Sequence, residues 1–175
     1  MPSTPSQPSG LRASRPSKGA SESTVRWQRQ IPEAMRSLGA LDDADYADIV
    51  TASARRLPKR GPEEWVRAGL DGVPRGVLLI TPFVQRVFLG LRLKLRPAPD
   101  RLLGWQIVER GENWLRVEAG SWFLTGHVVM HADEETLSFA SFIRYDRWLA
   151  KVVWPPVSLV HRQVALALVR GAVRE

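Results

Sequence analysis

The stretch YDRWLAKVVWPPVSLVHRQVALALVRGAVR, from Tyr145 to Arg174, decides the fold because it predicts one long terminal helix with an apolar side. Proline fits only the lead-in or first turn of a helix, so Pro156 marks the predicted start and Ala172 the predicted end. Such a helix is about 25 Å long, enough to cross a small sheet. Its basic residues share one sector, and His161 falls among the apolar residues of the opposite sector. The helix therefore needs a large apolar surface to cover.

The chain from Leu102 to Ile143 supplies that surface as a predicted run of antiparallel strands. Apolar and polar residues alternate along it, and three turns set the expected register. The register pairs Ile107 with Val117, Trp105 with Ala119, Leu103 with Ser121, Ser121 with Val128, and Met130 with Leu137. One face results from all three turns, and it consists of Leu103, Trp105, Ile107, Leu115, Val117, Ala119, Ser121, Val128, Met130, Leu137, Phe139, Ser141 and Ile143.

The chain before these strands predicts one strand followed by helices. Residues 45–57 form the expected first strand, and 61–72 form a short helix with a proline in its first turn. Two helical pieces follow, with Thr81 capping the second. The expected fold class is therefore α+β: a helix-grip in which an antiparallel sheet wraps around a long C-terminal helix, with two or three helices inserted after the first strand. Such folds commonly leave an apolar cavity between sheet and helix.

Composition bounds the organisation of the 175 residues. We expect a disordered, basic, Pro/Ser-rich tail at 1–24, a lead-in segment at 25–43, and one folded domain at 44–175. The chain has no cysteine, which excludes disulfides, thiolate zinc sites and cysteine nucleophiles. The net charge is +7, and more than half of it lies in the first 30 residues. No apolar run reaches the roughly 20 residues of a membrane span, so we expect a cytoplasmic protein.

Two segments carry a resemblance to a known family. The segment GWQIVERGENWLRVEAGSWFLTGHVV, at 104–129, is followed by YDRWLAKVVWPPVSLVHR, at 145–162. Together they resemble a bacterial domain of unknown function whose relatives also occur fused behind short-chain-dehydrogenase-like modules. That domain looks like a distant member of the START and polyketide-cyclase (SRPBCC) superfamily. The resemblance covers about 44–173 and implies a START-like helix-grip domain, but no established reaction. No GxGxxG motif is present, so no dinucleotide site is implied.

The three histidines are candidates for metal ligands or catalytic residues. His127 and His131 are four apart on a predicted strand, about 13 Å at 3.3 Å per residue, so they cannot share one metal ion. We interpret both as structural or solvent-facing, and we expect no cofactor and no metal site. His161 lies on the sheet-facing side of the last helix, where it could meet Ser121, Ser141 or a ligand hydroxyl. The alternative is a core histidine satisfied by a backbone carbonyl or by Tyr145.

The leading hypothesis is a binding module rather than an enzyme, holding a small hydrophobic molecule or lipid between the sheet and the C-terminal helix. The residues expected to line that space are Trp105, Val117, Ser121, Met130, Phe139, Ser141 and His161. Two alternatives remain open: a cyclase- or dehydratase-type enzyme using His161 as acid or base, and an interaction protein with a filled core and a basic arm. We expect no specific nucleic acid partner, and the oligomeric state is open. The apolar run 77–91 with the following basic residues leaves a peripheral membrane contact open, against the favoured interpretation of a helix that closes the grip.

Overall fold

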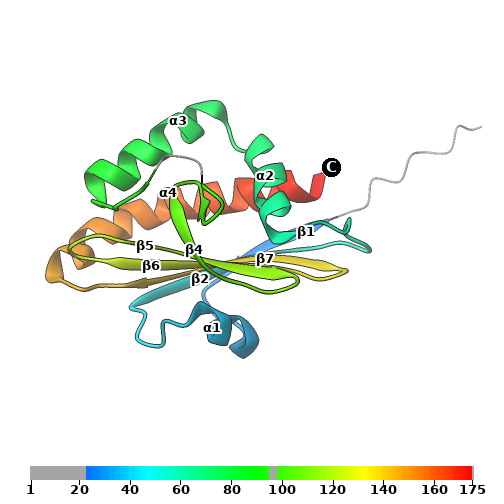
Figure 1. Cartoon of the computed structure of the whole chain (residues 1–175), viewed down its shortest axis with the longest axis horizontal. Helices are drawn as coiled ribbons and strands as arrows, with labels where there is room; N and C mark the ends of the chain where they lie inside the picture. The colour runs from blue at the N-terminus through cyan, green and yellow to red at the C-terminus, as the bar shows by residue number, and fades with distance from the viewer. Residues whose placement is uncertain (1–22, 95–97, 175) are drawn as a thin grey trace, which may run out of the picture.

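The computed structural model describes residues 23–94 and 98–174, which form one α+β fold (Figure 1). Seven antiparallel strands make an open sheet in the order β1-β2-β7-β6-β5-β4-β3. The strands are β1 (Thr24–Gln28), β2 (Tyr46–Ser53), β3 (Arg101–Leu102), β4 (Trp105–Arg110), β5 (Trp114–Gly120), β6 (Thr125–Ala132) and β7 (Thr136–Arg144). The helices are α1 (Glu33–Gly39), α2 (Pro62–Asp71), α3 (Arg75–Phe83), the π-helical turn η1 (Val84–Phe88) and α4 (Trp148–Arg174). The expected helix-grip-like arrangement is confirmed.

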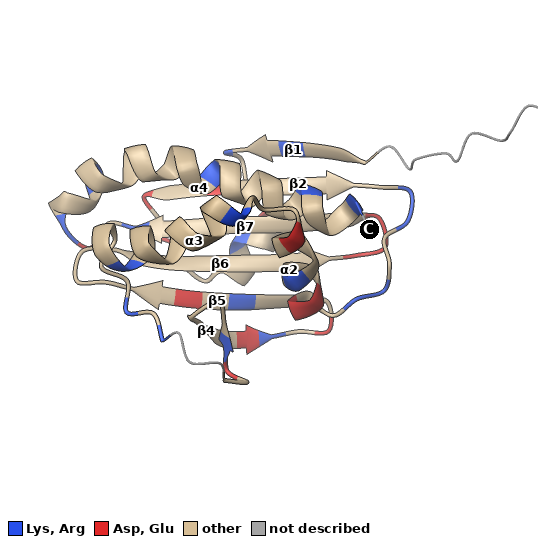
Figure 2. Cartoon of the chain, turned by 90° about the horizontal axis from the view of Figure 1, so that it is seen from above, with Lys and Arg blue, Asp and Glu red and all other residues tan. Residues whose placement is uncertain are grey.

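The helices are divided unequally between the two faces of the sheet. Helices α2, α3 and α4 lie on one face, and α1 lies on the other (Figure 1). Figure 2 looks onto the face that α2, α3 and α4 cover. Strand β6 is therefore buried on both sides, and its residues 126–130 are all buried despite the alternation of a strand. The α4 side holds the larger part of the core, while α1 closes a smaller core around Ile49, Val129 and Phe142.

The predicted strand register is right in one hairpin and wrong in the next two. Ile107 pairs with Val117 as expected. Val128, however, pairs with Val117 rather than Ser121, and Met130 pairs with Phe139 rather than Leu137. The turns lie at other residues than predicted, but each error shifts the pairing by an even number. Side chains alternate with a period of two, so the inner face kept its composition.

Leu103 and Ser121 are the two predicted face residues that leave the sheet. Leu103 has a φ of 54° in the tight β3–β4 turn, and its side chain is exposed. Ser121 follows the end of β5, and its hydroxyl accepts hydrogen bonds from the backbone N–H groups of Phe123 and Leu124. This hydroxyl-to-backbone turn explains why β5 ends before Ser121.

Helix α4 begins eight residues before the predicted start at Pro156. Pro155 and Pro156 lie inside it, and both are exposed. Each proline removes the bond to the carbonyl four residues earlier, but these carbonyls lie on the exposed side where solvent can bond them. The first turns are stabilised by Ala150 and Trp154, which are buried in a core cluster between α4 and the sheet. Packing therefore overrides the local signal of the prolines.

The segment after α2 also differs from the prediction. Thr81 does not cap a second helix; it lies inside α3, and its hydroxyl donates to the Val77 carbonyl at 2.7 Å. Pro82 is likewise inside α3 rather than at a first turn. A proline cannot donate the helical bond and crowds the preceding turn, and the helix widens into η1 directly after it. One continuous helical arm results instead of two pieces.

The folded part reaches further toward the N-terminus than the boundary expected at residue 44. Strand β1 pairs with β2 along its whole length, and α1 packs on the outer face of the sheet. The lead-in segment 25–43 is therefore part of the domain. The strand predicted at 45–57 is β2, the second in chain order. The disordered tail predicted at 1–24 falls almost entirely outside the described residues.

Within the described chain, α4 is long and apolar enough to cross a membrane by length and composition alone. The sequence analysis had found no such stretch. In the structure, Ala165, Leu168, Val169 and Ala172 of α4 are buried in the main core. Only 22% of the apolar window of α4 is buried within the fold.

Candidate functional site: an apolar cavity under the helices

A cavity of about 620 Å³ lies between the inner face of the sheet and the helices. Its floor is formed by β5, β6 and β7, and its walls by α2, α4 and the β3–β4 turn. Helix α3 and the turn η1 cover it, and no residue of α3 is buried. The lining is mostly apolar, with Leu70, Leu115, Met130 and Leu168 among its members. The volume falls in the range of about 300–1,000 Å³ that is typical of small-molecule sites.

Five of the seven residues predicted to line the site lie on this cavity. They are Trp105, Val117, Met130, Phe139 and His161. Ser141 is close to the cavity but completely buried behind the lining. Ser121 is in the β5–β6 turn and does not line the cavity. The inner face was predicted well enough to find the cavity floor, and the error in Ser121 follows from the misplaced turn.

His161 is the main polar group on the α4 wall. Its Nε2 lies 2.8 Å from Ser141 Oγ, and its ring lies between Phe139 and Trp154. Burial lowers the pKa of His161 below its ordinary value, although the negative charge of Asp48 opposes this shift. The imidazole is therefore neutral at neutral pH. Within residues 23–94 and 98–174, no hydrogen bond reaches Nδ1, so this nitrogen is available to a molecule in the cavity.

Trp154 places an unused hydrogen-bond donor beside His161. Its side chain lines the cavity, is only 3% exposed, and packs edge-on against Tyr46 with ring centroids 5.3 Å apart. The indole N–H is buried, and no described group accepts its proton. A buried donor left unpaired costs about 1–3 kcal/mol. Trp154 was not among the residues predicted to line the site, although its seven-residue spacing from His161 puts both on one side of the helix.

A second polar cluster, also missed, lies behind the cavity wall. Asp48 of β2 is buried and accepts hydrogen bonds from Tyr46 Oη at 2.6 Å and from Trp27 Nε1 at 3.0 Å. Burial, together with the bond to Asp48, raises the pKa of Tyr46 far above its ordinary value. Asp48 and Ser141 are partners across β2 and β7, so this carboxylate lies on the α4 side. Tyr46 and Asp48 are two residues apart in a strand, which indicates from the sequence alone that they lie on one face of the sheet.

The other two histidines have structural surroundings. His127 Nδ1 donates to the carbonyl of Gly39 at 2.9 Å, which fastens α1 to the sheet. His131 contacts the side chain of Asn113. In the part of the chain that the structure describes, no group of three or more His, Cys, Asp or Glu side chains could hold a metal ion.

The arm that covers the cavity presents apolar side chains to the outside. Leu79 is 80% exposed, and Ile80, Phe83, Val87 and Phe88 are also exposed. These five residues of α3 and η1 are called the arm surface below.

The fold and cavity define a helix-grip-like α+β protein with a partly open apolar cavity. Comparison of the chain with protein-family models, with curated proteins and with solved structures finds no match.

Proposed function

We propose that this protein binds a small hydrophobic molecule or lipid in the cavity between the sheet and α4. The observation that carries the proposal is the composition of the cavity wall. A space of about 620 Å³ is lined mostly by apolar side chains, and His161 places a polar ring on its α4 wall. Apolar burial supplies the affinity at roughly 25 cal/mol per Å². His161 orients an oxygen of the ligand.

The free ring nitrogen of His161 supports a ligand that carries a hydrogen-bonding oxygen. His161 Nδ1 can bond a hydroxyl group, because Ser141 already holds Nε2. The site therefore favours an oxygen-bearing apolar molecule.

Filling the cavity from the α4 wall tests the proposal. Val164 lines the cavity, so Val164→Trp fills part of it. Val152 is on the same helix, is 62% exposed and lies away from the cavity, so Val152→Trp is the matched control. We expect calorimetric titration with dodecanol to show binding to the wild type and to Val152→Trp, and none to Val164→Trp. Equal binding by all three proteins contradicts a ligand site in this cavity.

A second candidate function is acid/base catalysis by His161, favoured by its neutral imidazole in a desolvated cavity. Ser141 is a poor nucleophile candidate because it is completely buried in the middle of β7. In an enzyme of cyclase or dehydratase type, His161 is the acid or base that exchanges a proton with the substrate. Loss of turnover in His161→Gln with unchanged ligand affinity supports this function; unchanged turnover excludes His161 as the catalytic group.

The remaining expectations stay as proposals. The helix-grip arrangement supports a relationship to the START and polyketide-cyclase superfamily. The arm surface supports a peripheral membrane contact next to the cavity. Co-flotation of the protein with anionic vesicles tests that contact. We expect flotation to be lost in Leu79→Ser and kept in the control Val108→Ser, whose site is on the exposed part of β4. Failure of both the wild type and Val108→Ser to float rejects the membrane contact.

A further inference from the structure

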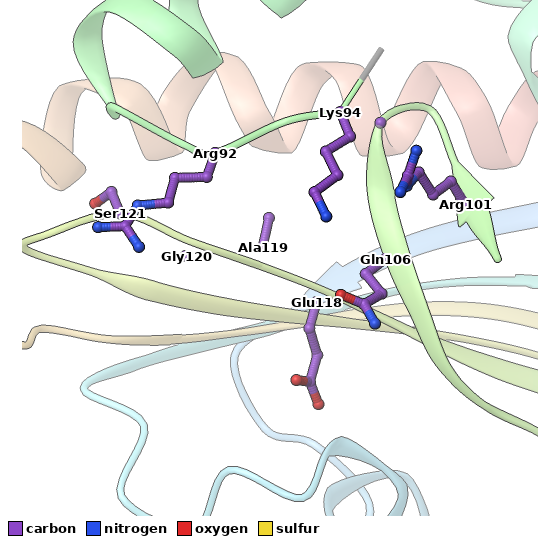
Figure 3. Close-up of a pocket in the computed structure, with 9 residues that line it drawn as sticks. Arg92, Lys94, Arg101, Gln106, Glu118, Ala119, Gly120 and Ser121 are labelled. Carbon is purple, nitrogen blue, oxygen red and sulfur yellow. The ribbon is translucent and has the colours of Figure 1, made fainter. Parts of the chain in front are cut away.

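A second cavity of about 320 Å³, with a more polar lining, shares residues with the apolar one. Figure 3 shows the residues that line it. Three basic side chains, Arg92, Lys94 and Arg101, define it and are called the basic cleft below. Arg101 and Gly104 line both cavities, so the basic cleft opens beside the apolar space at the β3–β4 turn. Nothing in the proposed function uses these three cations.

The backbone fixes where two of the cations lie. In the segment after η1, the Arg92 N–H is bonded to the carbonyl of Gly120 and the Lys94 N–H to the carbonyl of Gly104. The Leu93 N–H bonds the Leu91 carbonyl, which makes a tight turn at Arg92. Leu91 and Leu93 are buried, whereas Arg92 and Lys94 are exposed and line the basic cleft. Figure 3 shows both side chains reaching from this segment toward the edge of the sheet.

The positive charge of the basic cleft is balanced only in part, by Asp100 beside Arg101. Within the described residues, the Arg92 guanidinium and the Lys94 ammonium make no hydrogen bond or ion pair. The acid at the cleft wall, Glu118, points to the other face of the sheet (Figure 3), where it bonds Arg116 Nε at 3.2 Å. Arg101 is 22% exposed, and its nearest carboxylate, Asp100, lies 3.9 Å away. Three cations around one small cavity repel one another and favour an anion between them.

We infer that the ligand is an anionic amphiphile, with its apolar part in the cavity under the helices and its carboxylate or phosphate group in the basic cleft. This inference rests on the proposed function. Arginine and lysine match carboxylate and phosphate oxygens with charge-assisted hydrogen bonds, and arginine can do so with two parallel bonds. The anionic end stays at the solvent edge, so the charge never enters the apolar space.

The test compares three probes that share one apolar chain: dodecanol, dodecanoate and dodecyl phosphate. Calorimetric titration of the full chain is expected to show an anion preference over dodecanol of about tenfold or more. The single variants Arg92→Gln and Lys94→Gln change exposed side chains without other contacts, so they leave the fold intact. Each is expected to lower the affinity for the anions several-fold and to leave dodecanol binding unchanged.

The control variant Lys151→Gln/Arg170→Gln removes two exposed cations on α4, and we expect it to keep the anion preference. Equal wild-type affinity for dodecanol and both anions overturns the inference but leaves the proposed function standing. The inference is also overturned, with the proposed function left standing, if Arg92→Gln and Lys94→Gln lower the affinities for dodecanol and for the anions equally. Failure of all three probes to bind overturns the proposed function and the inference with it. The stronger of the two anions identifies the head group as carboxylate or phosphate.

Discussion

Gly171→Ala should destabilise the protein although alanine is a better helix former than glycine. A Cβ at Gly171 would lie 2.6 Å from Gly72 Cα and 2.7 Å from the carbonyl oxygen of Gly69. Both are backbone atoms of the α2 end, so no side chain can rotate away. Ordinary carbon contacts are about 3.5–4.0 Å, and α2 must therefore move by roughly 1 Å. Overpacking of this kind costs about 1–3 kcal/mol, more than the gain of up to about 1 kcal/mol in helix propensity.

The matched control is Gly76→Ala in α3, where a Cβ meets nothing within 4 Å. This variant is expected to be neutral or more stable by up to about 1 kcal/mol. Urea unfolding of the two variants and the wild type gives the free energies of unfolding. The two substitutions should change stability in opposite directions, or Gly171→Ala alone should destabilise. A Gly171→Ala protein as stable as Gly76→Ala would refute the close crossing of α2 and α4.

Three further predictions concern the polar groups near the cavity. Burial lowers the pKa of His161 in the folded state, so at mildly acidic pH the unfolded state binds more protons than the folded state does. The free energy of unfolding should therefore fall as pH drops from about 7.5 to 5.5, by at most about 1.4 kcal/mol per pH unit for this group. In His161→Gln the free energy of unfolding, measured by urea unfolding, should depend less on pH. An equal pH dependence in the wild type and His161→Gln contradicts this prediction. Trp154→Phe removes a buried donor that has no acceptor among the described residues, so it should lower the free energy of unfolding by less than the roughly 3–5 kcal/mol of a large-to-small core change; a loss in that range indicates that the donor has a partner. Tyr46→Phe should lower the free energy of unfolding by about 1.5–3 kcal/mol, because Asp48 loses its 2.6 Å hydrogen bond, and a neutral effect indicates that the pair does not stabilise the fold.

Side-chain alternation made the sheet face predictable from the sequence, but it did not locate the turns. The β5–β6 turn is closed by the Ser121 hydroxyl, a local bond that periodicity cannot detect. An even-numbered slip leaves the inner face intact, so Val117, Met130 and Phe139 line the cavity although their partners were misassigned. Ser121 sits at the turn itself and is the residue that the slip displaced.

The helices were less predictable, because proline signals compete with packing. Pro155 predicted a helix boundary that burial of Trp154 overrides. Residues from distant parts of the chain complete the surroundings of the candidate site: Asp48 comes from β2, Arg92 from the segment after η1, and Arg101 from β3. Such groupings depend on the tertiary arrangement and on backbone bonds such as that from Arg92 to Gly120, which no local pattern contains.

Native mass spectrometry of the full chain purified from its own host tests the central claim most directly. The account predicts one hydrophobic molecule per chain in the wild type and in Val152→Trp, released on denaturing extraction and missing from Val164→Trp. Bare wild-type protein that also takes up nothing from a library of lipids and metabolites would contradict the claim that the cavity is a ligand site.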